Sequence, residues 1–125
     1  MKYQELLNFK GVKMKVADVI NILATKQVLD ERKIFVYATA KNIIGGTVGA
    51  LQGLVLLSVC GDVLYLHRAK LDNSCERCLG NFYIPDLKNV KAKAGLFGGS
   101  FSFEAEGQKY RFKLPSRANK FVDFF

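Results

Sequence analysis

The chain has 125 residues, of which 50% are hydrophobic and 24% are charged, and this composition is typical of one globular domain and excludes a disordered or fibrous chain. Nineteen Lys and Arg residues against eleven Asp and Glu residues give a formal net charge of +8, which favours anionic partners such as nucleic acid or an acidic membrane surface. Three cysteines are too few for a disulfide framework, and residues 1–15 lack the apolar core of a signal peptide, so we expect a cytoplasmic protein.

The first third of the chain predicts a helix followed by a strand. Apolar residues recur at helical spacing over Val16–Gln27, so we expect an amphipathic helix there, preceded by a short turn around Tyr3–Phe9. The segment Ile34–Ala40 is β-branched and aromatic, which predicts a strand. We therefore assign residues 1–31 to an N-terminal helical extension and residues 32–125 to the main domain.

The uncharged segment Ile43–Cys60 has glycines at the spacing that packs transmembrane helices. The dipeptide Gly61-Asp62 separates it from another apolar run, and two apolar runs joined in this way are typical of a β-hairpin. We therefore predict strands over Ala50–Val59 and Val63–Ala69 in preference to a transmembrane helix.

The second half of the chain predicts further strands and a closing helix. The segment Leu71–Gly80 is polar and predicts a loop, and Pro115-Ser116 supplies a break and an N-cap before a short amphipathic helix that runs to the end. Between the loop and the helix we expect four strands, near Phe82–Ile84, Asn89–Leu96, Ser100–Glu106 and Lys109–Leu114.

The last two of these strands alternate strictly between apolar and polar residues, which indicates one buried and one wet face. The apolar residues of the closing helix also need a partner surface. We expect six residues to share one core: Phe101, Phe103, Tyr110, Phe112, Phe121 and Val122.

Several segments carry a resemblance to a known family: Gly53–Val59, Gly61–Leu66, Phe82–Val90, Gly95–Phe103 and Lys109–Phe112. In hydrophobic pattern and turn glycines they resemble the bacterial PH-like and GRAM-like domains of the pleckstrin-homology superfold. The resemblance covers about Arg32 to Phe125 and implies a mainly β (α+β) fold, a seven-stranded antiparallel bent barrel capped by the C-terminal helix, with the N-terminal amphipathic helix outside it. A different small β-barrel with a capping helix is the alternative.

The sequence predicts no enzyme and no cofactor, because no nucleophile, acid–base or phosphate-loop pattern is present. Cys75 and Cys78 have C-x-x-C spacing and, with Cys60 and His67, could supply four zinc ligands. We predict no metal, since Cys60 and His67 would lie on adjacent strands and could face opposite sides of the sheet. The four residues are then a buried strand cysteine, a strand-edge histidine and two loop thiols.

The first functional expectation is a non-catalytic binding or scaffolding module that acts through self-association or a protein partner. The loop Asn42–Gly49 has an apolar pair, Ile43 and Ile44, that either contacts a second subunit or folds back over the end of the barrel. PH domains that bind phosphoinositides use basic residues in and around the corresponding loop, and this loop has none after Lys41.

The second functional expectation is a binding face for an anionic membrane surface or nucleic acid. Basic residues recur on the predicted fifth and seventh strands, where alternation points those of the seventh strand outward. The candidate residues are Lys91, Lys93, Lys109, Arg111 and Lys113.

Overall fold

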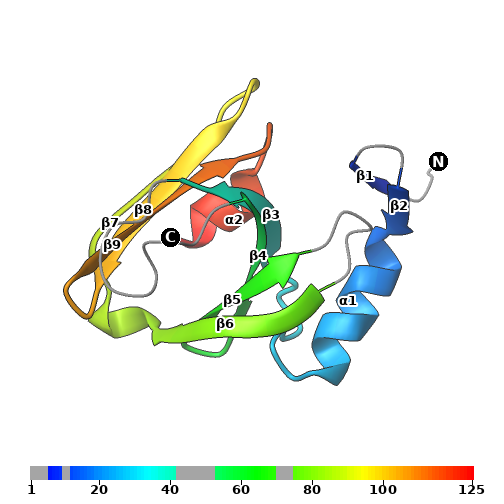
Figure 1. The fold of residues 1–125 in the computed structure, drawn as a ribbon, viewed down its shortest axis with the longest axis horizontal. Coiled ribbons are helices and arrows are strands. Elements are labelled where there is room, and N and C mark those ends of the chain that lie inside the picture. Colours follow the sequence, from blue (N-terminus) through cyan, green and yellow to red (C-terminus); the bar gives the residue numbers. More distant parts are fainter. Residues whose placement is uncertain (1–5, 10–11, 42–52, 70–74) are drawn as a thin grey trace.

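The computed structural model describes residues 6–9, 12–41, 53–69 and 75–125, and its main feature is a seven-stranded antiparallel sheet in the order β6-β5-β4-β3-β9-β8-β7 (Figure 1). A separate hairpin, β1 (Leu6–Phe9) and β2 (Val12–Lys15), leads into α1 (Val16–Thr25), and α2 (Asn119–Phe124) follows the last strand. The strands of the sheet are β3 (Phe35–Ala40), β4 (Gly53–Cys60), β5 (Val63–Ala69), β6 (Cys75–Tyr83), β7 (Lys88–Lys93), β8 (Gly99–Ala105) and β9 (Gln108–Leu114).

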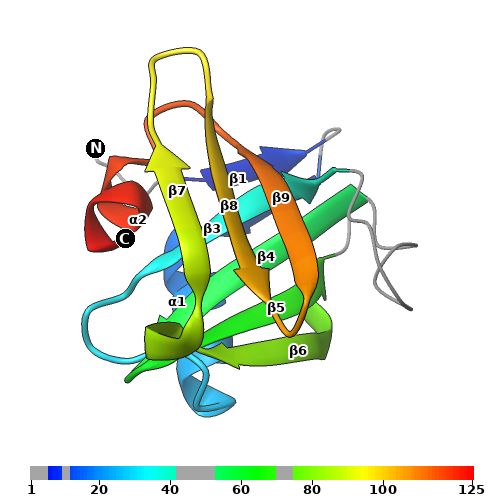
Figure 2. The ribbon, with the colours of Figure 1, turned by 90° about the vertical axis from the view of Figure 1, so that its left-hand side faces the viewer.

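The sheet consists of two meanders that meet where β3 pairs with β9. The strands β3 to β6 pair in chain order, and so do β7 to β9. A short ladder, Thr39 with Lys113 and Ala40 with Phe112, joins the two halves. Figures 1 and 2 show the halves folded toward each other, so that the strands of one cross those of the other.

The seven antiparallel strands expected of the bent barrel are present, but the sheet that they form is open. Among the described strands, β6 and β7 are the two edges and have one neighbour each. They are joined by a single 3-10 turn, Ile84–Asp86, which carries Pro85. Proline has no backbone N–H to donate to a ladder, so strand β6 does not continue past this turn.

The main core lies between the two halves of the sheet, and the predicted core is confirmed. Its aromatic rings pack edge to face or stacked: the centroid of Phe101 lies 5.0 Å from that of Phe121 and 4.8 Å from that of Phe125. Helix α2 therefore covers one end of this core (Figure 1). Of the six expected residues, five are buried and Val122 is half-buried against them: Phe101, Phe103, Tyr110, Phe112 and Phe121.

Helix α1 packs on the opposite face of the β3–β6 half and forms a second apolar cluster. Val19 and Leu23, one helical turn apart, are fully buried there. They pack with Leu29 and with outward residues of the sheet, among them Tyr37 and Leu56. The order of layers is therefore α1, the β3–β6 half, and the β7–β9 half.

Three element predictions are wrong in detail. The segment expected as a turn around Tyr3–Phe9 contains strand β1, and most of the expected loop Leu71–Gly80 belongs to β6, which tolerates polar residues at the edge of the sheet. The N-cap of α2 is Ala118, without a side-chain hydrogen bond, instead of Ser116. The backbone N–H of Arg117 donates to Gly95 O at 2.9 Å, and this long-range bond shapes the turn before the helix.

Within the described ranges, no helix has the length and apolar character needed to cross a membrane. Of the segment Ile43–Cys60, which was weighed as a transmembrane helix, the described part Gly53–Cys60 is strand β4. The predicted interface residues Ile43 and Ile44 lie outside the described residues.

Candidate anion-binding face

The outward face of β7, β8 and β9 carries basic residues in three rows that cross the strands. Each row has a basic residue on β7, a serine or glutamate on β8 and a basic residue on β9. The rows are Lys93–Ser100–Lys113, Lys91–Ser102–Arg111 and Lys88–Glu104–Lys109, and we call their six basic residues the basic face.

Strand alternation and one bulge produce this pattern. On β9, Lys109, Arg111 and Lys113 are exposed because the residues between them are buried in the core. On β7, a shift of register between Lys88 and Lys91 brings Lys88 opposite Glu104, in line with the other two rows.

The structure brings all five predicted basic residues together on one face. It adds Lys88, whose place depends on the bulge, and Lys41, whose backbone N–H donates to Arg111 O at 2.9 Å just beyond the end of β3. The alternation of apolar and polar residues could not place either lysine on this face. The position of Lys88 depends on the register of β7, and that of Lys41 depends on the pairing of β3 with β9.

A groove of about 480 Å³ lies on this face, between the end of β3 and strand β8. Ser100 and Ser102 line it with hydroxyl groups, and Lys41, Arg111 and Lys113 line it with positive charges. Phosphate and carboxylate oxygens accept hydrogen bonds from hydroxyl, ammonium and guanidinium groups. The groove is therefore suited to an anionic group.

Neighbouring acids offset only part of the positive charge of the basic face. Glu104 is the one carboxylate in the three rows. Between residues that the structure describes, one ion pair forms, and it joins Arg32 to Asp30. The rows therefore produce a positive potential over this half of the sheet.

Protection of a sheet edge explains only part of this pattern. Lysines on an edge strand hinder its pairing with another chain, and β7 is an edge strand that also has a bulge. Strand β9 lies between β3 and β8, so its basic residues protect no edge. The charges of Lys109, Arg111 and Lys113 therefore call for a different explanation.

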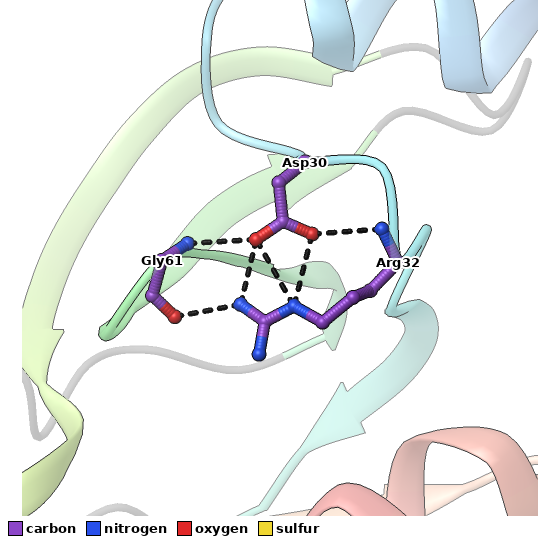
Figure 3. Close-up of polar contacts among 3 residues, drawn as sticks. All are labelled: Asp30, Arg32 and Gly61. Carbon is purple, nitrogen blue, oxygen red and sulfur yellow. Dashed lines mark hydrogen bonds and ion pairs between the residues drawn. The ribbon is translucent and has the colours of Figure 1, made fainter.

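The densest polar cluster of the described residues lies elsewhere and has a structural role (Figure 3). Gly61 N–H donates to Asp30 Oδ2 at 2.8 Å, and Arg32 Nη2 donates to the same oxygen at 2.6 Å and to Gly61 O at 2.8 Å. The Arg32 guanidinium and the N–H of Gly61 hold the pKa of the Asp30 carboxyl well below its usual range. Arg32 also lies over the ring of Phe124, 5.1 Å from its centroid, so the cluster ties the loop after α1 to the β4–β5 turn and to α2.

A buried polar pair, Ser58 and His67, lies on the sheet face that α1 covers. Ser58 Oγ and His67 Nε2 are 3.0 Å apart, and both residues are almost completely buried. Burial, with a smaller contribution from the charge of Lys26, lowers the pKa of His67 to about 4. The prediction of a strand-edge histidine is wrong, because β5 lies between β4 and β6.

Three of the four candidate zinc ligands, Cys60, His67 and Cys78, have described side chains, and these three do not form a cluster. Cys60 pairs with Val63 and His67 pairs with Leu56, so the two lie at opposite ends of the β4–β5 ladder, about 13 Å apart by the rise of a strand. Cys60 is half-buried, and Cys78 is exposed on β6 instead of in a loop. The described residues contain no group of three His, Cys, Asp or Glu side chains placed to hold a metal.

Comparison with protein-family models, with curated proteins and with solved structures found no match for this chain.

Proposed function

We propose that the chain is a non-catalytic binding module of the PH-like kind whose basic face binds a phosphate-bearing anionic partner. The observation that carries this proposal is the set of three rows on β7–β9, in which basic residues flank Ser100, Ser102 and Glu104. Six cations on one sheet face with one carboxylate between them favour a polyanion over a neutral or cationic surface.

The order of the elements supports the PH-like part of the proposal. Seven antiparallel strands run as a meander of four and a meander of three, and a short helix then packs against the end of the core. The resemblance stated from the sequence implied seven antiparallel strands followed by a capping helix. The open edge between β6 and β7 is the feature that departs from the expected barrel.

The environment of the Ser58–His67 pair supports a non-catalytic role. A serine hydroxyl beside a histidine is the start of a nucleophilic site, but such a site needs access to substrate. Ser58 is 0% and His67 2% exposed. This pair is therefore better explained as a hydrogen bond that satisfies two buried polar groups.

Self-association through Ile43 and Ile44 remains a prediction, since both residues lie outside the described part of the chain. The mass of the protein in solution, compared with that of an Ile43→Ser, Ile44→Ser variant, tests it independently of the basic face.

Neutralising two charges on β9 tests the proposed function. We expect the wild-type protein to bind at least one of three probes: heparin, a single-stranded oligonucleotide, or vesicles of phosphatidylglycerol and phosphatidylcholine. The double variant Arg111→Gln, Lys113→Gln should bind that probe about thirtyfold more weakly, since each cation near an anionic surface contributes about 1 kcal/mol. Binding should also weaken as salt concentration rises.

The matched control is the double variant Lys26→Gln, Lys33→Gln, which removes two exposed charges that lie outside the three rows. Its affinity should change far less than that of the β9 variant. Equal losses in the two variants would mean that net charge alone drives binding, and failure of the wild-type protein to bind any probe at physiological ionic strength would overturn the proposal.

A further inference from the structure

The turn between β7 and β8 presents two apolar side chains to solvent. Leu96 is 66% and Phe97 is 98% exposed, and they are the two central residues of the turn from Gly95 to Gly98. Figures 1 and 2 show this turn projecting at the end of the β7–β8 hairpin. Leucine and phenylalanine side chains lie next to each other at this projecting tip. The free energy falls when an apolar environment covers them.

Backbone contacts hold this turn in shape. The N–H of Gly98 donates to Gly95 O at 3.5 Å, and the N–H of Arg117 donates to the same oxygen at 2.9 Å. A Cβ atom at Gly95 would lie 2.7 Å from Gly98 O, and Gly98 has a φ of +130°, so both positions require glycine. Leu96 and Phe97 are thus presented by an ordered turn, which lowers the entropic cost of binding through them.

Basic residues lie at the base of the turn. Lys93 and Lys113 form the row of the basic face closest to it, and Arg117 is bonded to Gly95 through its backbone. Successive rows are about 7 Å apart along the strands, so the row that holds Lys88 and Lys109 lies about 14 Å farther from the tip. The positive charges closest to the apolar tip are therefore those at the base of the turn.

We propose that the Gly95–Gly98 turn inserts Leu96 and Phe97 into the boundary between headgroups and acyl chains of an anionic lipid bilayer. Lys93, Lys113 and Arg117 then contact the lipid phosphates. This inference rests on the proposed function, because it names the bilayer as the anionic partner of the basic face. In an anionic bilayer the charged phosphates lie outside the apolar acyl chains. An apolar pair at the tip with basic residues behind it matches this order.

The exposed side chains favour a bilayer over nucleic acid. Proteins that bind single strands stack bases on exposed aromatic rings, and the aromatic residues of β8 and β9 are buried in the core. Of the exposed pair at the tip, Phe97 has a ring on which a base could stack and Leu96 has none, whereas both side chains are suited to acyl chains. A nucleic acid on the flat sheet would also engage all three rows alike, whereas a tip inserted in a bilayer engages the nearest row most strongly.

A tryptophan at the tip reports insertion directly, since the chain contains no tryptophan. In Phe97→Trp, we expect vesicles of phosphatidylglycerol and phosphatidylcholine to shift the indole emission to shorter wavelength, and brominated acyl chains to quench it. Tyr83→Trp is the matched control, because Tyr83 is also an exposed aromatic residue, 53% exposed, at the end of β6. Its emission should change little with the same vesicles.

Affinity measurements on the same vesicles test the contribution of each residue. Phe97→Ser should bind about tenfold more weakly, because one apolar side chain no longer leaves water. Lys93→Gln, Lys113→Gln should lose about fivefold for each charge, and Lys88→Gln, Lys109→Gln should lose less than that. Circular dichroism checks that each variant is folded.

The outcomes separate this inference from the proposed function. If vesicles bind but the Phe97→Trp emission does not shift, or the third row contributes as much as the first, the turn does not insert and binding by the basic face alone stands. If the protein binds the oligonucleotide or heparin but not vesicles, the bilayer is the wrong partner. If it binds none of these probes, the proposed function is wrong as well.

Discussion

His67 is a titratable residue buried inside the protein, where its Nε2 contacts Ser58 Oγ. Burial disfavours the charged form of its imidazole. Its pKa is lowered from 6.5 to about 4, so the folded protein binds this proton less readily than the unfolded chain does. Stability from the neutral imidazole is therefore complete above pH 6.5 and is lost as the pH falls from there to about 4.

We predict that the free energy of unfolding falls by about 3 kcal/mol between pH 7 and pH 4 because of His67. Urea unfolding at a series of pH values measures this loss. The variant His67→Gln keeps a polar partner for Ser58 but cannot titrate, so its stability should change little between pH 7 and pH 5. A wild-type curve as flat as that of the variant would contradict the assignment.

The carboxylate of Asp30 acts in a different pH range. Its pKa is held below its ordinary value of 3.8, so its contribution to stability is lost only as the pH falls below that value. Loss of stability above pH 4 therefore reports His67, and loss below it reports carboxylates such as Asp30.

Among the elements, α2 depends most on tertiary contacts. It has six residues, its N-cap makes no side-chain hydrogen bond, and such a short helix is marginal by itself. Phe121 is its one fully buried residue and packs edge to face on Phe101. The helix is therefore held by the core and by the cation–π contact of Arg32 with Phe124.

We predict that Phe121→Ala destabilises the protein by about 3–5 kcal/mol, because it leaves a cavity at the end of the core. Chemical denaturation measures the change. Phe97→Ala is a matched control, since it removes the same atoms from a 98% exposed position and should change stability by less than about 0.5 kcal/mol. Similar losses in the two variants would mean that Phe121 does not hold α2 in place.

The elements that could be predicted are those whose apolar residues recur with a single regular spacing, either that of a strand or that of a helix. Strands β8 and β9 alternate strictly, and α1 follows helical spacing, so both faces of each could be assigned from the sequence. Strand β6 was missed in its first half because Cys75–Gly80 is polar and irregular, and its pairing with β5 contains shifts of register. Pairing partners, and not local pattern, decide such a segment.

The candidate site could be predicted in its composition but not in its shape. Alternation indicated that Lys109, Arg111 and Lys113 point outward, and the structure shows these charges in register with those of β7. The register depends on the lengths of two turns and on a bulge. The exposed pair at the β7–β8 turn was missed because Leu96 was assigned to the end of a strand.

At the scale of the whole molecule, the seven-stranded sheet of the described residues is open, and its β7 edge is protected by charge. Lys88, Lys91 and Lys93 lie along this strand, and the bulge interrupts its ladder. Both features oppose pairing with the edge of another copy. The lysines of β7 thus protect an edge of the sheet, a role that the basic residues of β9 do not have because β9 is an interior strand.

We predict that replacing the three lysines of β7 by threonine makes the protein self-associate, because threonine favours strands and removes the repulsion at the edge. Sedimentation velocity over a range of concentrations measures the change in mass. The corresponding β9 variant, Lys109→Thr, Arg111→Thr, Lys113→Thr, removes as many charges from an interior strand and should keep its mass. Equal association of both variants would show that net charge, and not the edge, controls solubility.

The short ladder between β3 and β9 has a consequence for the order in which the protein folds. Strand β3 is synthesised about seventy residues before Phe112 and Lys113, which are the partners of Ala40 and Thr39. Until then the hairpin of β4 and β5 can form locally, but its inward face has no opposing layer. We therefore expect a nascent chain that ends before Gln108 to expose this apolar face and to need a chaperone, and folding to complete only after residues 108–124 have emerged.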